Sequence, residues 1–264
     1  MLKKFKAFIM QDSQRVWSAL VMIVVLGVVF WINNRELTWA SMGVLYLIAM
    51  YEATKLYQIN LHTFSIILAV VLWVALYFST KQAHMVVATL GLCAASIYAI
   101  RDNSDSGFKL IAPFIYPSLP FVSLYSLYCL GVGYLVWLII VVAIADIFAY
   151  YGGKKLGRTP LCAMSPKKTI EGALCGIVGG VIAGSVAGIG IFGTFPIAAI
   201  SSVFIIICSI IGDLFESALK RRANLKDSGT ILPGHGGILD RIDAILFGSV
   251  AMLFILSLLT MYHP

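Results

Sequence analysis

The chain has 264 residues, of which 60% are hydrophobic and only 12% are charged, and its mean hydropathy is +0.95. Soluble domains carry about 25% charged residues, so this composition excludes an ordinary soluble fold. Repeated uncharged runs of about 20 residues predict an all-α polytopic integral membrane protein instead. The net charge of +7 indicates basic cytoplasmic loops and attraction to anionic lipid heads or phosphates, and no nucleic-acid partner is expected.

Apolar segments mark the expected membrane spans. Residues 110–153 contain a single charge, Asp146, and are long enough for one very long helix or for two spans. The positive-inside rule favours two spans, because a single span would export the basic clusters at 154–168 and 220–241. The other spans are expected at 17–32, 39–57, 62–79, 85–100, 172–192, 195–213 and 244–262.

The same rule sets the orientation of the chain. With the N-terminus in the cytoplasm, only Arg35 and Lys81 among the loop lysines and arginines lie outside. We therefore expect about nine transmembrane helices, N-in and C-out, in a bacterial inner (cytoplasmic) membrane. Pro113, Pro117 and Pro120 predict an irregular start for the fifth span.

Glycine recurs every four residues along the span at 172–192 and forms a continuous small-residue ridge. Such a ridge lets another helix approach closely, either within the chain or between the two copies of a homodimer. The ridge consists of Gly172, Gly176, Gly180, Gly184 and Gly188.

The first polar candidates lie between 146 and 172. Asp146 ends an apolar run, and a carboxylate at the membrane edge is either functional or simply at the water interface. Ser165-Pro166 favours a turn, and Ser165 or Thr169 is expected to cap the next helix. Lys167 and Lys168 then lie near a helix N-terminus, where they suit a phosphate, although a positive-inside signal is the alternative.

A second group of polar residues shares one helical face at i, i+3, i+4 and i+7. Two carboxylates, a hydroxyl and an ammonium on one stripe are typical of a metal and phosphate site, whereas a solvated helix face would scatter its charges. The stripe consists of Asp213, Glu216, Ser217 and Lys220.

The segment that follows is rich in turn residues. Gly236 and Gly237 permit turn conformations and expose N–H groups that suit phosphates. Asp240 and Asp243, at i and i+3, are expected on one face at the start of the last span. Carboxylates at this density favour Mg²⁺ over zinc, and His235 lacks a His or Cys partner at zinc-ligand spacing.

Together these residues form a membrane-edge cluster of carboxylates and cations, which is what phosphoryl or nucleotidyl transfer requires. The sequence contains no G-x-x-x-x-G-K-[ST], G-x-S-x-G or H-E-x-x-H motif, so ATPase, serine hydrolase and zincin functions find no support.

The order of these residues resembles the signature of the phosphatidate cytidylyltransferase (CDP-diacylglycerol synthase) family over residues 217–243. The segments 146–150 and 165–172 also resemble family elements, whereas the similarity before residue 146 is one of hydropathy alone. Ile147 and Ile170 depart from the family pattern without removing a charge. The positions that fill the signature are Ser217, Lys220, Arg221, Lys226, Asp227, Pro233, His235, Gly236, Gly237, Asp240, Arg241 and Asp243.

The resemblance implies a reaction in which CTP and phosphatidate give CDP-diacylglycerol and pyrophosphate, with Mg²⁺ and room for a second cation. It implies metal-binding aspartates at Asp213 and Asp240, which we expect the glycine-rich turn to bring together. Asp146, Glu216 and Asp243 are further metal candidates. The catalytic candidates are Asp213, Asp240, Lys220, Arg221, Lys226, Asp227, His235 and Arg241, and the substrate-binding candidates are Ser165, Lys167, Lys168, Thr169, Ser217, Gly236 and Gly237.

Two other functions stay open at this point. A CTP-dependent kinase for a polyprenol-type lipid would share the signature in part, but the complete pattern favours the synthase. A membrane transporter would show inverted repeats and mid-membrane polar breaks, and neither is evident in this sequence. We expect N-terminal transmembrane helices at 1–110 and a C-terminal catalytic region at 111–264.

Overall fold

A computed structural model describes residues 21, 24–60, 62–102, 107–162, 164–231 and 236–262, and this part of the chain is helical throughout apart from turns and one isolated bridge. Residues 24–32 are helical. The short 3-10 helices η1 (Lys81–Ala83) and η2 (Gly107–Ile111) precede α4 and α5. The α-helices with described bounds are α2 (Arg35–Leu56), α3 (Thr63–Phe78), α4 (His84–Asp102), α5 (Ala112–Ile115), α6 (Ser118–Leu130), α7 (Val132–Leu156), α8 (Ile170–Phe192), α9 (Phe195–Arg222) and α10 (Leu239–Tyr262).

Six segments of the described chain are long and apolar enough to cross a membrane, which supports the all-α multi-pass class. α2 is not apolar enough and α3 has only 16 residues, so these two helices do not count among the six. The expected nine spans and their orientation therefore stay predictions, and the span expected at 17–32 lies partly outside the described residues. The six segments are Lys81–Arg101, Lys109–Leu130, Val132–Leu156, Ile170–Phe192, Phe195–Arg222 and Leu239–Leu259.

Residues 110–153 hold two long apolar segments, as the positive-inside argument predicts. The break falls at Gly131, between α6 and α7. The irregular start expected from the prolines is confirmed, because α5 is a four-residue helix and α6 begins only after Pro117. Residues 110–153 therefore pass through the bundle twice.

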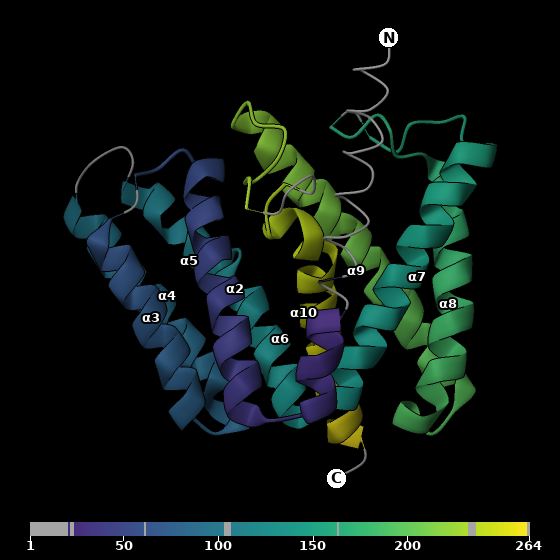
Figure 1. The fold of residues 1–264 in the computed structure, drawn as a ribbon, viewed down its shortest axis with the longest axis horizontal. Helices are drawn as coiled ribbons and strands as arrows, with labels where there is room; N and C mark the ends of the chain where they lie inside the picture. The colour runs from purple at the N-terminus through teal and green to yellow at the C-terminus, as the bar shows by residue number, and fades with distance from the viewer. Residues whose placement is uncertain are drawn as a thin grey trace.

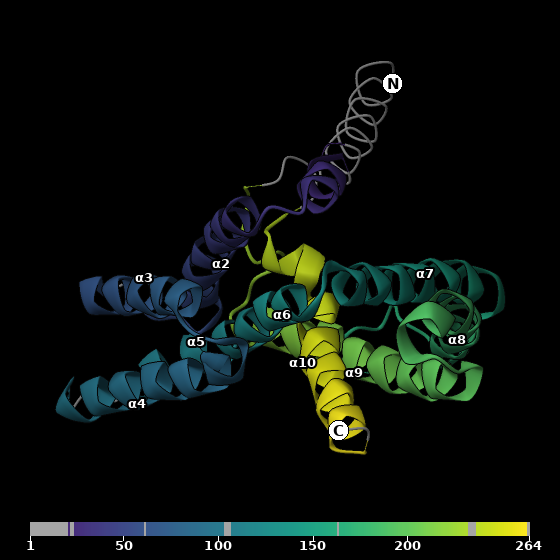
Figure 2. The ribbon, with the colours of Figure 1, turned by 90° about the horizontal axis from the view of Figure 1, so that it is seen from below.

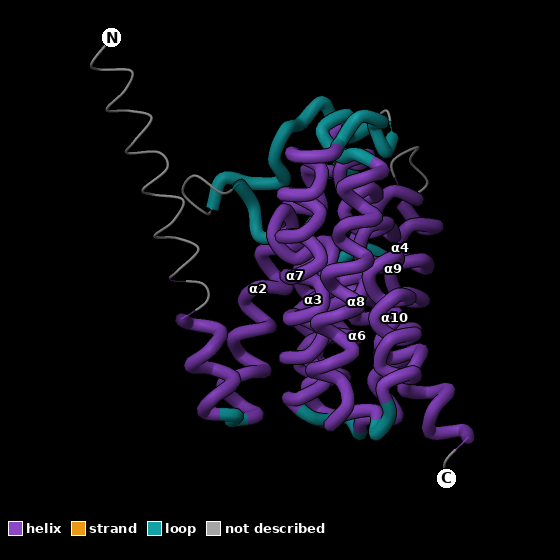
Figure 3. Tube along the Cα trace, turned by 90° about the vertical axis from the view of Figure 1, so that its right-hand side faces the viewer, coloured by secondary structure: helices purple, strands orange, loops and turns teal. Residues whose placement is uncertain are grey.

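The long helices alternate in direction, so the connections gather at two ends of the bundle (Figure 1). The connection between α7 and α8 and the turn that follows α9 lie at the same end, at the top of Figure 1, whereas the connection between α6 and α7 lies at the other end. Figure 3 shows the larger share of the loops at that upper end. The basic clusters at 154–168 and 220–241 thus occupy one end of the molecule, as predicted.

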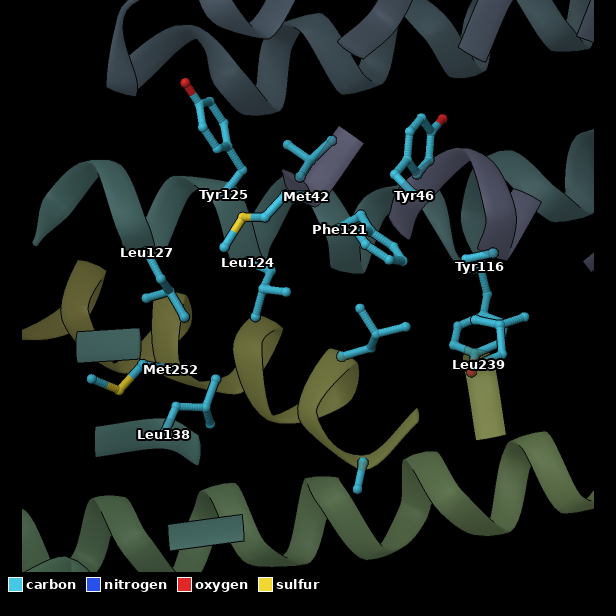
Figure 4. Packing of buried hydrophobic residues seen from close by; sticks show 14 of the residues in the cluster. Met42, Tyr46, Tyr116, Phe121, Leu124, Tyr125, Leu127, Leu138, Leu239 and Met252 are labelled. Atoms are coloured by element: carbon cyan, nitrogen blue, oxygen red, sulfur yellow. The ribbon is translucent and has the colours of Figure 1, made fainter. Parts of the chain in front are cut away.

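Seen along the helices, the bundle has two wings joined at the centre (Figure 2). α3 and α4 form one wing, while α7, α8 and α9 form the other, with α6 and α10 between them. Phe121 and Leu127 of α6 are fully buried, and Figure 4 shows α6 side chains between those of α2 and α10. Tyr46 of α2 stacks on Trp73 of α3, with 5.1 Å between ring centroids, and so ties one wing to this core.

The glycine ridge of α8 packs within the chain. A Cβ atom added at Gly172 or Gly176 would lie 2.8 Å from a backbone carbonyl oxygen of α7, that of Ala149 or Ala145. Further along, a Cβ atom at Gly184 would meet two side chains, that of Val141 on α7 and that of Ser202 on α9. The ridge therefore serves close packing of α8 on α7, which is one of the two alternatives that the sequence left open; a homodimer stays a prediction.

Replacement of Gly176 by Ala should destabilise the protein, with Gly190→Ala as the matched control. Both substitutions gain about 1 kcal/mol of helix propensity, but only the Cβ at 176 meets the Ala145 carbonyl, and overpacking costs about 1–3 kcal/mol. No atom lies within 4 Å of a Cβ at 190. Thermal unfolding in detergent should give Gly176→Ala a lower Tm than Gly190→Ala, and an equal or higher Tm would contradict the packing.

Candidate functional site

The first part of the site is a cavity of about 480 Å³ at the loop-bearing end of α7, α8 and α9. Asp146 of α7 and Asp213 of α9 both line it, together with Lys167 and Lys168 from the 157–169 loop. The Lys168 ammonium forms an ion pair with Oδ2 of Asp213. The cavity thus combines carboxylates and ammonium groups at the edge of a membrane-spanning bundle.

Local hydrogen bonds hold the basic loop over this cavity. Thr169 caps α8 by accepting a hydrogen bond of 3.1 Å from the Gly172 N–H, which confirms the expected cap. Glu171 accepts hydrogen bonds from the backbone N–H groups of Arg158 and Thr159, at 3.0 and 3.2 Å. The loop that carries Lys167 and Lys168 is therefore fixed at both of its ends.

Burial lowers the pKa of the Lys168 ammonium, and the carboxylates of Asp243 and Asp146 oppose that shift. The positive charge of Lys220 lowers the pKa of Lys168 further. Because these effects reach Lys168 from α7, α9 and α10, its position links the cavity to the second part of the site.

The second part of the site centres on Lys220, near the end of α9. Its ammonium donates to Oδ1 of Asp240 at 2.7 Å and to Oε2 of Glu216 at 3.2 Å. Glu216 and Lys220 face each other because they are one helical turn apart. Glu216 is fully buried, and the side chain of Lys220 is only 14% exposed, so this network is shielded from water.

Asp240 lies in the first turn of α10 and is held by the turn before it. Its Oδ2 accepts hydrogen bonds from the Gly237 N–H and the Ser228 N–H, both at 2.8 Å, and from the Ser228 hydroxyl at 3.0 Å. Gly236 has a φ of +85°, a conformation that favours glycine. The turn therefore folds the chain back, and the Gly237 amide donates to Asp240; its expected role with a phosphate stays a prediction.

Two buried oxygen atoms beside this network have no hydrogen-bond partner within the described structure. They are Oε1 of Glu216 and the hydroxyl of Tyr116, whose ring packs against Phe215 and Phe247. Tyr116 also lies within electrostatic reach of Glu216 and Asp243. Since buried polar groups normally have a partner, the two oxygens mark a place for a water molecule or a cation.

The expected meeting of Asp213 and Asp240 at one metal ion stays a prediction. Each aspartate binds a lysine, Lys168 or Lys220, and among the described residues no three Asp, Glu, His or Cys side chains converge closely enough to hold a metal. The donor chemistry still fits Mg²⁺, because the groups are carboxylates and Oε1 of Glu216 is unpaired. The two ammonium groups occupy places where a cation would be attracted.

The structure describes most of the remaining candidates. Ser165 begins the turn before Lys168, since its carbonyl accepts the Lys168 N–H at 3.0 Å. Ser217 is partly buried on α9. His235 and Pro233 lie outside the described residues. Exposed side chains at the same end of the bundle are those of Arg221, Lys226, Asp227 and Arg241.

Sequence reasoning missed two residues of the site. Glu52 of α2 is fully buried against the turn at 228–239, and Tyr116 contributes one of the unpaired oxygens. Glu52 is a carboxylate within an apolar run, and the rule that singled out Asp146 applies to it equally. Tyr116 gives no such signal, because tyrosine is common throughout this chain.

A model described as the cytidylyltransferase family matches residues 13–259. The chain belongs to this family. The carboxylates and lysines of both parts of the site fall within the matched residues, and so does Glu52.

Named relatives of this family member include enzymes from several bacteria. A phosphatidate cytidylyltransferase from Helicobacter pylori strain J99 is 40% identical over 260 residues, which cover 97% of this chain and 96% of that protein. One from strain 26695 is 38% identical over 250 residues, or 94% and 92% of the two chains. One from Bacillus subtilis is 39% identical over 143 residues, about half of each chain.

Substitution of Lys220 by Met should destabilise this cytidylyltransferase family member strongly. Removing the ammonium leaves the carboxylates of Glu216 and Asp240 buried without their cation, and breaking a buried pair in this way costs about 3 kcal/mol or more. The measurement is the free energy of unfolding in an SDS titration, carried out without divalent cations.

Arg222→Met is the matched control for this prediction, because Arg222 is exposed in the last turn of the same helix. Its effect should be within about 0.5 kcal/mol, as for other surface substitutions. Equal effects of the two substitutions would show that Lys220 does not neutralise buried charge.

Proposed function

We propose that the chain is a phosphatidate cytidylyltransferase, which converts CTP and phosphatidate into CDP-diacylglycerol and pyrophosphate in phospholipid biosynthesis. The observation that carries the proposal is the end-to-end similarity to the Helicobacter pylori J99 enzyme of that name. The lysine and carboxylate network at one end of the bundle supports it, because both substrates are anionic phosphates.

The reaction needs no nucleophile from the protein. An oxygen of the lipid phosphate attacks the α-phosphorus of CTP, a new P–O bond forms, and the bond to the β-phosphate breaks as pyrophosphate leaves. The protein has to align two anions and neutralise their charge. Lysine and arginine side chains of this chain would do so. They come from the 157–169 loop, the end of α9, the turn that follows it and the start of α10: Lys167, Lys168, Lys220, Arg221, Lys226 and Arg241.

Magnesium is part of this proposal. When bound, Mg²⁺ would supply charge neutralisation and would orient the phosphates. Asp213 and Asp240 would hold the Mg²⁺ ion. Further or supporting ligands would be Asp146, Glu216 and Asp243. A second cation would bind oxygen atoms of the same carboxylates. Lys168 and Lys220 now pair with the two aspartates, and phosphate oxygens are their natural alternative partners.

The proposed location is the bacterial inner membrane, with the site facing the cytoplasm, where CTP is found. Its support is the concentration of basic loops at the end of the bundle that carries the site. The cavity between α7, α8 and α9 then lies where a soluble nucleotide and a membrane-held phosphate can meet.

Purified protein in detergent, given labelled CTP, phosphatidate and Mg²⁺, should release CDP-diacylglycerol and pyrophosphate in equal amounts. Release of CDP and a new lipid phosphate would identify a CTP-dependent kinase instead. Asp213→Asn and Asp240→Asn should each lower kcat by about 100-fold or more, because a carboxylate that would hold Mg²⁺ at the reacting phosphates is lost. Both variants should keep the elution profile of the folded protein, and near-wild-type turnover in either would refute its assignment.

A membrane-impermeant thiol reagent applied to intact cells tests the orientation, in a variant without the five native cysteines. Cysteine placed at exposed Gln82 should react, whereas cysteine placed at exposed Arg222 should react only after the cells are opened. The reverse pattern would put the candidate site on the outer face.

A further inference from the structure

Glu52 is the one carboxylate outside the C-terminal half that reaches the candidate site within the described structure. It lies near the end of α2 and is fully buried. Its Oε1 accepts the Ile238 N–H at 3.0 Å, and its Oε2 accepts the Leu239 N–H at 2.9 Å. No lysine or arginine of the described chain pairs with it.

These contacts compensate the charge of a buried carboxylate without a cation. Ile238 and Leu239 stand at the start of α10, where backbone N–H groups have no partner inside the helix. A negative group is stabilised at such a helix end, and hydrogen bonds to a charged group are stronger than neutral ones. Glu52 thus fixes the first turn of α10 from a different helix.

The turn before α10 is shaped to admit this side chain. A Cβ atom at Gly229 would lie 2.8 Å from Cδ of Glu52, and one at Gly237 would lie 2.5 Å from its Oε2. Larger residues at these two positions would therefore push Glu52 away. The absence of a side chain at 229 and 237 therefore leaves the space that the Glu52 carboxylate fills.

The same turn holds Asp240, so the two carboxylates share a support. The Ser228 hydroxyl lies 2.9 Å from Oε2 of Glu52 and 3.0 Å from Oδ2 of Asp240. A hydroxyl has one proton and can donate to one of the two at a time. Gly237 completes the link, because its N–H donates to Asp240 next to the two N–H groups that bind Glu52.

We infer that Glu52 is a positioning residue for Asp240, acting through Ser228 and the first turn of α10 so that the Asp240 carboxylate is directed at Lys220 and at a divalent cation. The inference rests on the proposed function for the role of Asp240. A purely structural cap would predict a loss of stability alone, whereas a positioning residue also sets the affinity of the site for the cation.

The test is the binding of Mn²⁺ to detergent-purified protein, measured from the EPR signal of the free ion without any substrate. Glu52→Gln keeps the size of the side chain but replaces one acceptor oxygen with an amide that cannot accept the N–H groups. We expect its Kd for Mn²⁺ to rise about tenfold or more above that of the wild type, since supporting residues typically contribute 10–100-fold to metal affinity. Glu36→Gln, on the exposed start of the same helix, should leave the Kd unchanged.

Ser228→Ala provides a second variant, because it removes only the shared hydroxyl and keeps every charge. It should weaken Mn²⁺ binding several-fold, and its result decides the matter if Glu52→Gln does not fold. In activity assays the Mg²⁺ concentration for half-maximal rate should rise in parallel, while KM for CTP at saturating Mg²⁺ stays within about twofold.

An unchanged Kd in the folded variants overturns the inference, even if their Tm falls, and so does the absence of Mn²⁺ binding to the wild type. Weakened binding in the variants supports it. A wild type that binds Mn²⁺ but forms no CDP-diacylglycerol would instead refute the proposed reaction, so the two failures are distinguishable.

Discussion

Neutralisation of buried charge is the constraint on which the rest of this structure depends. A chain with 12% charged residues places at least four carboxylates and two lysines at one end of an apolar bundle. Buried charges are tolerated only when paired and hydrogen-bonded. Lys220 between Glu216 and Asp240 and backbone N–H groups on Glu52 meet that need in two ways, and Lys168 pairs with the half-buried Asp213 in the cavity. Glu216 and Lys220 share α9, whereas Asp240, Asp213 and Glu52 each meet a partner from another segment of the chain.

The apolar pattern of the sequence predicts most of the helices, because runs of apolar residues between polar loops leave few other arrangements. The two segments within 110–153 follow from the distribution of Lys and Arg on either side. The glycine ridge likewise predicts close packing, although only the structure shows that α7 is its partner. The choice between partners depends on the full set of side chains on each helix, which spacing along one segment does not contain.

The candidate site was less predictable than the fold. The stripe of Asp213, Glu216 and Lys220 follows from helical periodicity, and Asp240 joins it through Lys220. Periodicity could not reveal that the two aspartates bind different lysines, since the pairing depends on the path of the 157–169 loop and of the turn at 228–237. The sequence did not reveal the role of Glu52, because its hydrogen-bond donors lie more than 170 residues away along the chain. No local sequence pattern reports contacts at that separation.

That separation has a consequence for how the protein is made. The chain is synthesised from its N-terminus, so the Glu52 carboxylate exists for the whole time needed to add the 186 residues up to its first backbone donor on α10. Until α10 is in place, Glu52 lacks its two backbone donors and Lys220 lacks Asp240. The charged end of the bundle is therefore complete only after α10 has been synthesised, and a chain cut short before α10 contains every lysine and glutamate of the cluster without the helix start that organises them.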